Sequence, residues 1–361
     1  MVSTPASMKA VLTTGESDRI HLTNAPVPKP GSGQILVKVI AAAQNPSEWM
    51  KLGLSAKNPA ANIPVGHDFA GIVAAIGPDV PAGLRTIGER IAGFVNGCLA
   101  ADLGGTFAEY TLADAQVVIS IPESLSFEDA ATLGLAGYTA CQTLWQSLTL
   151  PTPLEPTKEH LPILIWGGAT TVGQYAIQLA KLSGLHVVST ASSTNYQLLK
   201  DLGVDEVFDY HDPEISQKIR QATNGKLTYV IDCVATAETI RMIGNCIGDE
   251  GGYLASVLHT DVPRDNIKAD FPFVYTLLGK AISSVILPPS LMFPVIQEHF
   301  ELGKKFSNLL TQLLAEGKLK TTPVKLVPNG LQDVQYWVEY QRQGKVRAKK
   351  IVYRISDTPG I

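Results

Sequence analysis

The residues best suited to chemistry stand at positions 167–173, which read Gly-Gly-Ala-Thr-Thr-Val-Gly. An apolar run at 161–166 comes before them, and the segment 172–183 has the apolar spacing of a helix. A strand, a glycine turn and a helix in this order can bind a pyrophosphate, because the backbone bends tightly and the first N–H groups of the helix attract an anion. Thr170 replaces the middle glycine of the G-x-G-x-x-G pattern, but its hydroxyl can still donate to a phosphate oxygen. The pattern predicts a dinucleotide site; a crossover that binds nothing is the alternative.

The end of the next strand, at 186–190, indicates which dinucleotide is bound. The residues that follow, 191–196, read Ala-Ser-Ser-Thr-Asn-Tyr and contain no acid. An Asp or Glu about 20 residues after the turn would hold the ribose 2′-hydroxyl of NAD, and it would repel the 2′-phosphate of NADP. Hydroxyl and amide groups can bind that phosphate, with help from a distant lysine or from Tyr210. The segment therefore favours NADPH; an ordinary polar loop is the alternative.

Alternating strands and helices surround the glycine turn. Strands are expected at 161–166, 186–190 and 229–233, and helices at 172–183 and 215–222. This alternation predicts a parallel sheet with crossover helices. The chain before it is β-rich, with short strands expected at 10–13, 34–40, 71–77, 89–93 and 107–111, and the tail returns to a strand at 350–354. Between these regions Ser126 is expected to cap a helix that runs through Leu133.

Composition limits the partners. The 29 basic and 33 acidic residues give a net charge of -4, too weak and mixed for a nucleic-acid binder. No run approaches the 18–20 apolar residues of a membrane span, and the first ten residues lack a targeting signal. The four cysteines, Cys98, Cys141, Cys233 and Cys246, form no CxxC pair and are typical of a reducing compartment. These features predict a cytoplasmic protein that binds neither nucleic acid nor membrane.

The order of three motifs resembles a known superfamily. Asn45-Pro46-Ser47 comes first, Gly66-His67-Asp68-Phe69-Ala70-Gly71 second and the glycine turn third. This order resembles the medium-chain dehydrogenase/reductase superfamily, and more narrowly the fungal trans-acting enoyl reductases that serve polyketide synthases. The resemblance implies an α/β fold: a GroES-like β-rich catalytic domain formed by 1–128 and 305–361, and a Rossmann domain with a doubly wound parallel sheet at 129–304.

The same resemblance implies a set of NADPH contacts. The family often has a lysine three places after the serine of Asn-Pro-Ser, where this chain has Met50, with Lys51 one position later. The expected contacts are Ser47, Glu48, Trp49, Met50, Lys51, Thr139, Gly168, Thr170, Thr171, Val172, Gly173, Ser193, Thr194, Asn195, Tyr196, Tyr210, Val257, Leu258, Lys349 and Lys350.

The resemblance also bears on metal binding. Zinc members of the superfamily use an early cysteine, a Gly-His-Glu and a later cysteine, which supply three ligands and leave one position open. Here Gly66-His67-Asp68 matches the middle element, whereas Gln44 or Asn45 stands at the early cysteine. One His–Asp pair cannot complete a tetrahedral site, so His67 and Asp68 are interpreted as a structural turn and no metal is predicted.

Without a Lewis acid an enzyme cannot readily polarise an alcohol, but it can deliver hydride to the β-carbon of an enoyl thioester. Thr139 is predicted to be catalytic, orienting the nicotinamide carboxamide or the substrate carbonyl. Tyr138 is either a proton donor or core packing. The residues predicted to face the substrate are Ala140, Cys141, Gln142, Thr143, Leu144, Trp145, Gln146 and Ser147. The apolar stretches 271–279 and 283–289 could line a tunnel for an alkyl chain or form plain core.

These expectations predict reduction of an enoyl thioester carried by the acyl carrier protein of a polyketide synthase or a synthase–peptide synthetase hybrid. A zinc-independent quinone or small-enone oxidoreductase is the alternative, and an NADPH-binding protein without turnover is a third hypothesis. The resemblance implies a monomer, since the trans-acting enoyl reductases look monomeric as a group. Pro288, Pro289 and Pro294 are also expected near the edge of the parallel sheet, where proline discourages strand pairing.

Overall fold

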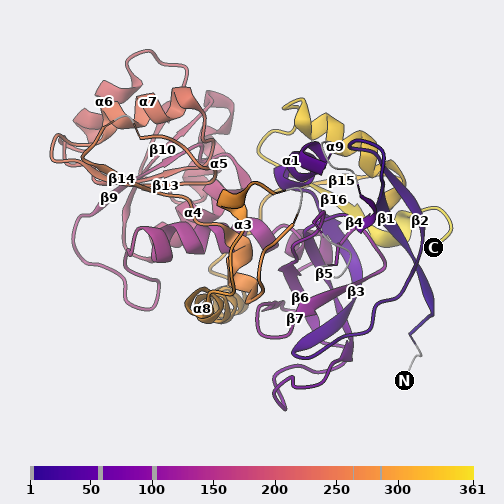
Figure 1. Ribbon diagram of the computed structural model, residues 1–361. Helices are drawn as coiled ribbons and strands as arrows, with labels where there is room; N and C mark the ends of the chain where they lie inside the picture. Colours follow the sequence, from indigo (N-terminus) through magenta and orange to yellow (C-terminus); the bar gives the residue numbers. More distant parts are fainter. Residues whose placement is uncertain (1–3, 56–59, 100–103, 263, 285–286) are drawn as a thin grey trace. The chain divides into compact units, whose positions relative to one another are not determined.

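A computed structural model describes residues 4–55, 60–99, 104–262, 264–284 and 287–361 (Figure 1). The chain forms two compact units, one from Met1–Leu135 with Tyr275–Ile361 and the other from Ala136–Val274. We call them unit 1 and unit 2. Boundaries after 128 and 304 were expected from the sequence; the units divide after Leu135 and Val274 instead. The second boundary differs because the segment that starts at Tyr275 packs within unit 1, where the Tyr275 ring centroid lies 5.5 Å from that of His67.

Unit 1 is built from two sheets. The larger has the order β15-β16-β3-β5-β6-β8, with β7 also paired to β3, and the smaller has the order β2-β1-β4. Strand β16 from the C-terminal segment pairs antiparallel with β3, so both ends of the chain build one sheet. The strands are β1 (Ser7–Thr14), β2 (Ile20–Pro26), β3 (Gln34–Ala43), β4 (Ala61–Pro64), β5 (Asp68–Ile76), β6 (Arg90–Phe94), β7 (Tyr110–Asp114), β8 (Ile119–Ser120), β15 (Val324–Val327) and β16 (Lys350–Arg354).

The core of unit 1 lies against the inner face of the larger sheet. Ile35 and Val37 alternate inward along β3 and pack with Phe69, Ile91 and Tyr353, all fully buried. This alternation is why the strands expected near 34–40, 71–77, 89–93 and 350–354 form. The helices of unit 1 are α1 (Pro46–Ser55), α2 (Phe127–Ala130), α8 (Gln297–Ala315) and α9 (Val334–Arg342).

The helix expected at Ser126 is shorter than predicted. The Ser126 side chain accepts a hydrogen bond from the Asp129 N–H, as an N-cap does, but α2 ends at Ala130. The next helix, α3 (Gly134–Cys141), starts against β5, where a Cβ on Gly134 would lie 2.4 Å from Oδ1 of Asp68. The Leu135 N–H donates to the same oxygen at 2.6 Å. The Asp68 carboxylate thus lies at the start of α3, where the helix N-terminus favours negative charge.

Unit 2 is a doubly wound parallel sheet with the strand order β11-β10-β9-β12-β13-β14. All of its neighbouring strands pair in parallel, and the order reverses between β9 and β12. Helices α6 and α7 lie next to each other beside the sheet (Figure 1). The elements are β9 (Pro162–Trp166), α4 (Thr171–Leu182), β10 (His186–Ala191), α5 (Tyr196–Asp201), β11 (Glu206–Asp209), α6 (Ile215–Ala222), β12 (Tyr229–Asp232), α7 (Ala237–Cys246), β13 (Gly252–Ser256) and β14 (Ile267–Asp270).

The sequence predicted an edge of this sheet near Pro288, Pro289 and Pro294, but the sheet ends earlier in the chain. The strand at that end is β14, and the chain leaves unit 2 after Val274. Pro288, Pro289 and Pro294 belong to unit 1, whereas the edge strand β14 belongs to unit 2. The monomer stays a prediction.

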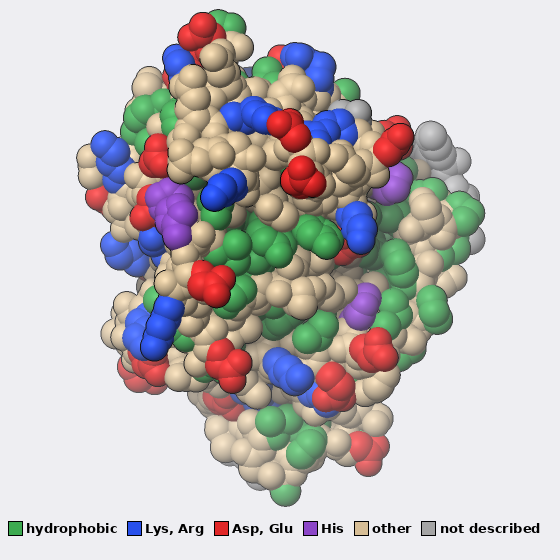
Figure 2. Space-filling model, turned by 90° about the vertical axis from the view of Figure 1, so that its left-hand side faces the viewer, with side chains coloured by type: hydrophobic (Ala, Val, Ile, Leu, Met, Phe, Trp, Pro, Cys, Tyr) green, Lys and Arg blue, Asp and Glu red, His purple; other side chains and the backbone are tan. Residues whose placement is uncertain are grey.

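The charged side chains are mixed in sign. Figure 2 shows lysine, arginine, aspartate and glutamate side chains interspersed over one face, in keeping with the net charge of -4. Among the described residues, no helix combines the length and the apolar character that a membrane span requires.

Candidate active site

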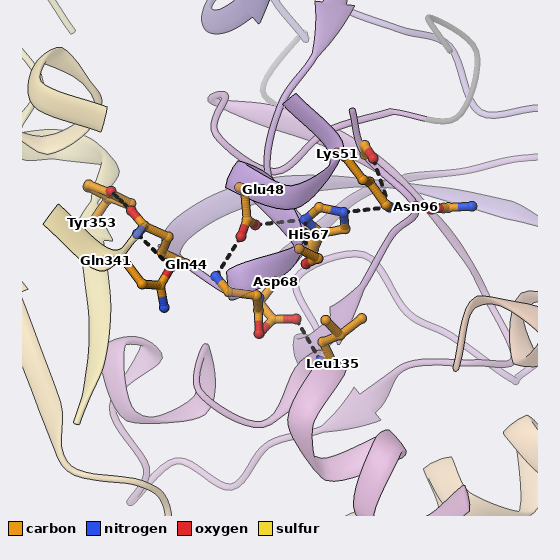
Figure 3. A network of polar contacts seen from close by, with 12 residues as sticks. Gln44, Glu48, Lys51, His67, Asp68, Asn96, Leu135, Gln341 and Tyr353 are labelled. Atoms are coloured by element: carbon orange, nitrogen blue, oxygen red, sulfur yellow. Dashed lines mark hydrogen bonds and ion pairs between the residues drawn. The ribbon is translucent and has the colours of Figure 1, made fainter. Parts of the chain in front are cut away.

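The centre of unit 1 holds a buried histidine with a charged group on each ring nitrogen (Figure 3). Nδ1 of His67 lies 2.7 Å from Oε1 of Glu48, and Nε2 lies 2.7 Å from Nζ of Lys51. Glu48 and Lys51 are three residues apart on α1, so they share one face of that helix. Proline suits the first helical position and α1 begins at Pro46, immediately after Asn45. The local fold thus aims both side chains at His67.

The ammonium of Lys51 is fully engaged. Besides His67, it donates to Oδ1 of Asn96 at 2.7 Å and to the Gly97 carbonyl at 3.1 Å. It also lies 3.8 Å from the centre of the Tyr275 ring. Because an ammonium has only donors, Nε2 of His67 must accept, and Nδ1–H then donates to Glu48. The imidazole is therefore neutral, in agreement with burial, which holds the pKa of His67 well below its ordinary value.

Burial brings two pKa values of this cluster close together. Burial raises the pKa of Glu48 to about 7, although hydrogen bonds from the backbone and the charges of Lys350 and Lys51 oppose it. Burial lowers the pKa of Lys51 to about 7, and electrostatic interactions with Cys98 and Glu48 oppose this shift. The two groups interact through His67, so they titrate as a pair near neutral pH.

A buried ion pair between Lys350 and Asp68 lies beside the Glu48–His67–Lys51 cluster. Nζ of Lys350, on β16, lies 2.5 Å from Oδ2 of Asp68 and 2.8 Å from Oδ1 of Asn45. The Asn45 amide also donates to Oδ2 of Asp68 at 3.0 Å. Burial raises the pKa of Asp68, and the charge of Lys350 lowers it. The pair holds β16, β5 and the start of α1 together.

Gln44, which precedes these residues, completes the network (Figure 3). Its amide donates to the Trp337 carbonyl at 3.0 Å and to Oε1 of Gln341 at 2.8 Å, and its oxygen accepts from the hydroxyl of Tyr353. Gln44, one of the two residues that match the early cysteine of zinc members, thus ties the end of β3 to α9 and β16.

The donors around His67 do not make a metal site. Within the described ranges, no group of three His, Cys, Asp or Glu side chains is arranged to hold an ion. Nε2 of His67 is already bound to an ammonium, and burial raises the pKa of the Cys98 thiol to about 12, so it stays neutral. The interpretation of His67 and Asp68 as a turn is wrong, because Asp68 opens strand β5 and both side chains are buried in the network.

The glycine turn of unit 2 is built as the sequence predicted. Gly167 has a φ of +79°, which favours glycine, and its N–H donates to Oγ1 of Thr190 at 3.0 Å. A Cβ on Gly173 would lie 2.5 Å from the Gly167 carbonyl oxygen, so only glycine lets α4 approach the turn. Thr170 is the N-cap of α4, where its hydroxyl oxygen accepts from the Gly173 N–H. The Thr170 side chain also interacts with that of Cys233.

The predicted cofactor residues of unit 2 gather at one edge of the sheet. Thr170–Gly173 follow β9, 193–196 follow β10, Tyr210 follows β11, and Val257 and Leu258 follow β13. Because these strands are parallel, their carboxyl ends share an edge, next to the point where the strand order reverses. Dinucleotides bind at this place in doubly wound sheets.

One acid near this edge was missed from the sequence. Asp209 ends β11, and its carboxylate lies 2.7 Å from Nδ1 of His211 and accepts from the His211 N–H. Hydrogen bonds from His211 lower the pKa of Asp209, with a smaller contribution from the backbone of Ser193. The carboxylate thus supports the loop 193–196 from the neighbouring strand. The sequence signal was the acid directly before Tyr210, in the segment Phe208-Asp209-Tyr210.

The predicted catalytic and substrate residues lie on α3 and the π-helix that follows it. Thr139 is 9% exposed, and Tyr138 is fully buried. The five residues from Ala140 to Leu144 are fully buried, as core packing requires, whereas Trp145, Gln146 and Ser147 are half-buried. The Trp145 indole N–H donates to the Pro151 carbonyl, and the Ser147 hydroxyl donates to Asp270 at 2.5 Å. A substrate role stays a prediction for this segment.

The other predicted residues have separate surroundings. Ser47 and Met50 are half-buried on α1, Trp49 packs against the core of unit 1, and Lys349 is exposed. Glu48, Lys51 and Lys350 bind buried partners, and the cofactor contacts expected of them stay predictions. In the stretches 271–279 and 283–289, Tyr275 and Leu277 are buried core residues, and 285–286 lie outside the described residues.

Asn96 and Tyr275 were not singled out from the sequence. Asn96 follows the apolar strand β6, where a polar residue next to Gly97 was a visible signal. Tyr275 lies far from α1 in the chain, and no local pattern connects it with Lys51.

Comparison with known proteins agrees with this architecture. Residues 31–123 match the family model of the alcohol dehydrogenase GroES-like domain, and residues 171–271 match that of the zinc-binding dehydrogenases. Together with the doubly wound sheet they define a medium-chain dehydrogenase/reductase, which confirms the predicted fold class. The solved structure of the CurK enoyl reductase has the same fold, with a TM-score of 0.75 at 20% identity over 96% of this chain and 99% of that one.

Two curated relatives narrow the family. The trans-enoyl reductase ACTTS2 of Alternaria alternata is 36% identical over 349 residues, covering 96% of this chain and 99% of that protein. The trans-enoyl reductase caaB of Aspergillus niger is 35% identical over 367 residues, covering 97% and 98%. The chain belongs to the trans-enoyl reductase family, as the resemblance indicated.

Proposed function

We propose that this protein is an NADPH-dependent enoyl reductase that works in trans on a polyketide synthase or a synthase–peptide synthetase hybrid. Its substrate is an α,β-unsaturated acyl thioester on an acyl carrier protein, and its product is the saturated thioester. Membership of the trans-enoyl reductase family supports the reaction type. The supporting observation in the site is the ammonium of Lys51 on Nε2 of His67.

That ammonium favours an alkene over an alcohol as substrate. Oxidation of an alcohol in this superfamily requires a Lewis acid to polarise the oxygen, and the donors around His67 do not fit a metal. An enoyl thioester needs no metal, because its own carbonyl withdraws electrons from the β-carbon. Hydrogen-bond donors and fixed positive charge then suffice to stabilise the enolate that forms.

NADPH, when bound, supplies the hydride. The start of α4 at Thr170–Gly173 would hold the pyrophosphate through backbone N–H groups and the Thr170 hydroxyl. Ser193 and Thr194 are exposed and would bind the 2′-phosphate through their hydroxyls, with Tyr196 and Tyr210 beside it. Thr139 would orient the nicotinamide carboxamide or the substrate carbonyl. The assignments of the pyrophosphate and the 2′-phosphate follow the order of the residues at the carboxyl edge of the sheet, whereas that of Thr139, on α3, follows the family resemblance.

The test is NADPH consumption by the purified protein with crotonyl-pantetheine and, separately, with a free quinone. NADH replaces NADPH in one control, and a chelator is added in another. We expect the thioester to be reduced with NADPH at a rate that the chelator does not change. Turnover of the quinone alone would support the quinone oxidoreductase, and loss of activity with the chelator would contradict metal independence.

A further inference from the structure

We propose that His211 binds the 2′-phosphate of NADPH through Nε2, and that Asp209 is a positioning residue that fixes its imidazole ring. This inference rests on the proposed function, which takes NADPH as the hydride donor. It names a cation for a phosphate site whose loop, 193–196, contains neither lysine nor arginine. The contacts that support it lie within unit 2.

Asp209 lies beside the loop that is predicted to bind the phosphate. Strands β10 and β11 pair in parallel, and their register places Asp209 opposite Ala191, the last residue of β10. The loop 193–196 follows β10, so it leaves the sheet at the same edge. Asp209 also interacts with both ends of this loop: the backbone of Ser193 helps to lower the pKa of Asp209, and burial together with the charge of Asp209 raises the pKa of Tyr196. A phosphate bound at the loop would therefore have the Asp209 carboxylate as a neighbour.

That carboxylate opposes the binding of a phosphate. An acid at the end of the second strand of a dinucleotide fold favours the free ribose hydroxyl of NADH and repels the 2′-phosphate of NADPH. Asp209 is an acid in register with that position, and its side chain is 34% exposed. Hydrogen bonds hold its pKa below the ordinary value, so the carboxylate is charged near neutral pH. A site for NADPH therefore needs a cation that offsets this charge.

His211 has the geometry that this role requires. Its Nδ1 lies 2.7 Å from Oδ1 of Asp209, and its backbone N–H donates to the same oxygen at 3.0 Å. Because a charged carboxylate only accepts, Nδ1 carries the proton of the side-chain bond. The imidazole also lies next to the ring of Tyr210, with 4.1 Å between the two centroids. Two hydrogen bonds and a ring contact thus fix the orientation of His211.

Nε2 is the atom of His211 that is left for a ligand. Among the described residues it has no hydrogen-bond partner, and the side chain is 66% exposed. An anion next to Nε2 favours the protonated imidazole, which donates from both nitrogens and carries a positive charge. That charge would offset the Asp209 carboxylate and attract the 2′-phosphate.

The next cation along the chain is already engaged. Nζ of Lys218 lies 2.5 Å from Oδ2 of Asp212 and 3.8 Å from the Glu214 carboxylate. The other oxygen of Asp212 accepts from the Glu214 N–H at 2.9 Å. Lys218 therefore serves the acids of its own segment, whereas His211 presents an open nitrogen.

The experiment measures how apo-protein binds 2′,5′-ADP, which has the 2′-phosphate, and 5′-AMP, which lacks it. Isothermal titration calorimetry at fixed ionic strength gives both dissociation constants. We expect the wild type to bind 2′,5′-ADP more tightly than 5′-AMP. His211→Asn should weaken 2′,5′-ADP about tenfold, as loss of a hydrogen bond to a charged group does, and should change 5′-AMP by less than about twofold. A variant that keeps the wild-type preference overturns the proposal.

The choice of asparagine separates phosphate binding from a structural role. Its amide can donate to Asp209, as Nδ1–H does, but it has no atom in the place of Nε2. A loop that needs only the bond to Asp209 would therefore bind both nucleotides as the wild type does. Lys218→Met is the matched control, because it removes a nearby cation that serves Asp212 and Glu214 instead. We expect it to keep the preference for 2′,5′-ADP within about twofold; an equal loss in both variants would overturn the assignment to His211.

A spectroscopic readout tests the contact and the role of Asp209 without turnover. In protein labelled with ¹⁵N-histidine at pH 8, 2′,5′-ADP should shift the His211 ring signals toward the doubly protonated form, and 5′-AMP should not. Asp209→Ala should let the ring of the free protein exchange between its two neutral tautomers. An unshifted His211 contradicts the contact, and an unchanged tautomer in Asp209→Ala contradicts the positioning role.

The same titrations distinguish failure of this inference from failure of the proposed function. If the wild type does not prefer 2′,5′-ADP, the proposed NADPH dependence fails, and the role of His211 fails with it. If the wild type prefers 2′,5′-ADP and His211→Asn does so equally, the role of His211 alone fails.

Discussion

Nζ of Lys350 lies 2.5 Å from Oδ2 of Asp68, and the two residues are 282 positions apart in the chain. The contact joins β16, from the C-terminal segment, to β5, from the N-terminal one. Both side chains are almost completely buried. This buried ion pair lies where the two chain ends meet, next to the antiparallel pairing of β16 with β3.

Lys350→Met should destabilise the protein strongly. Removal of one partner of a buried pair leaves the other charge without compensation, at a cost of about 3–5 kcal/mol. Urea unfolding followed by tryptophan fluorescence measures the change. The exposed neighbour Lys349→Met is the control and should stay within about 0.5 kcal/mol of the wild type. Equal stability of the two variants would contradict a structural role for the Asp68 pair.

The lowered pKa of Lys51 predicts that the free energy of unfolding increases with pH above about 7. Its pKa is about 7 in the folded protein and 10.5 ordinarily, so folding releases a proton in this range. A lowered folded pKa contributes stability that is complete above 10.5 and is lost as pH falls toward 7. In Lys51→Met this rise between pH 7 and 10 should disappear. Thermal unfolding scans at pH 7 and 9.5 test it, and an unchanged difference in Tm between the two pH values would contradict it.

The raised pKa of Glu48 predicts that its contribution to the free energy of unfolding decreases as pH rises toward 7. Its folded pKa of about 7 lies above the ordinary 4.5, so folding takes up a proton there. Its contribution to stability is complete below 4.5 and is lost as pH rises through 7. Glu48→Gln should therefore become more stable relative to the wild type as pH rises from 5 to 7. The same scans at pH 5 and 7 measure this, and a constant offset would argue against a perturbed Glu48.

Ser193→Asp should change the cofactor preference. A carboxylate at the end of β10 repels the 2′-phosphate and can bind a free ribose hydroxyl. We expect NADPH to bind at least about tenfold more weakly, which corresponds to ~1.4 kcal/mol, while NADH does not weaken. Fluorescence titration of both nucleotides provides the measurement, with Ser193→Asn as the neutral control. Unaltered NADPH affinity in Ser193→Asp would place the 2′-phosphate elsewhere.

Thr139→Ala should slow hydride transfer by about 10- to 100-fold if its hydroxyl orients the nicotinamide or the thioester carbonyl, the range that misplacement of reacting groups produces. Thr139→Ser retains the hydroxyl and should recover most of the rate. Single-turnover absorbance of NADPH reports the hydride step itself. Equal rates for the wild type and Thr139→Ala would remove the proposed role.

The sequence predicted the parts of the fold that depend on local pattern. The β9–α4–β10 unit has a glycine turn, two apolar strands and a periodic helix within thirty residues, and all of it forms where expected. Helix α1 was not expected, because Pro46 and the short spacing between motifs gave no clear apolar period. Without that helix, the three-residue spacing did not predict that Glu48 and Lys51 share one helix face.

The contacts that make the polar network depend on tertiary structure. His67 comes 16 residues after Lys51, and Lys350 and Tyr275 come from the other end of the chain. No periodicity connects such residues, so the sequence suggested a turn at His67 and Asp68 where the structure has a buried histidine between two charges. The compact units divide after Val274 and not after 304, and the packing of the Tyr275 ring near His67 is one such contact between distant parts of the chain.

The central claim is that hydride reaches the β-carbon of an enoyl thioester, and isotope transfer tests it most directly. The protein is incubated with NADPH deuterated at C4 and crotonyl-pantetheine, and the butyryl product is analysed by NMR and mass spectrometry. We predict one deuterium at the β-carbon and, in D₂O with unlabelled NADPH, one deuterium at the α-carbon instead. A saturated product without deuterium at the β-carbon, or no saturated product while a quinone is reduced, would contradict the account.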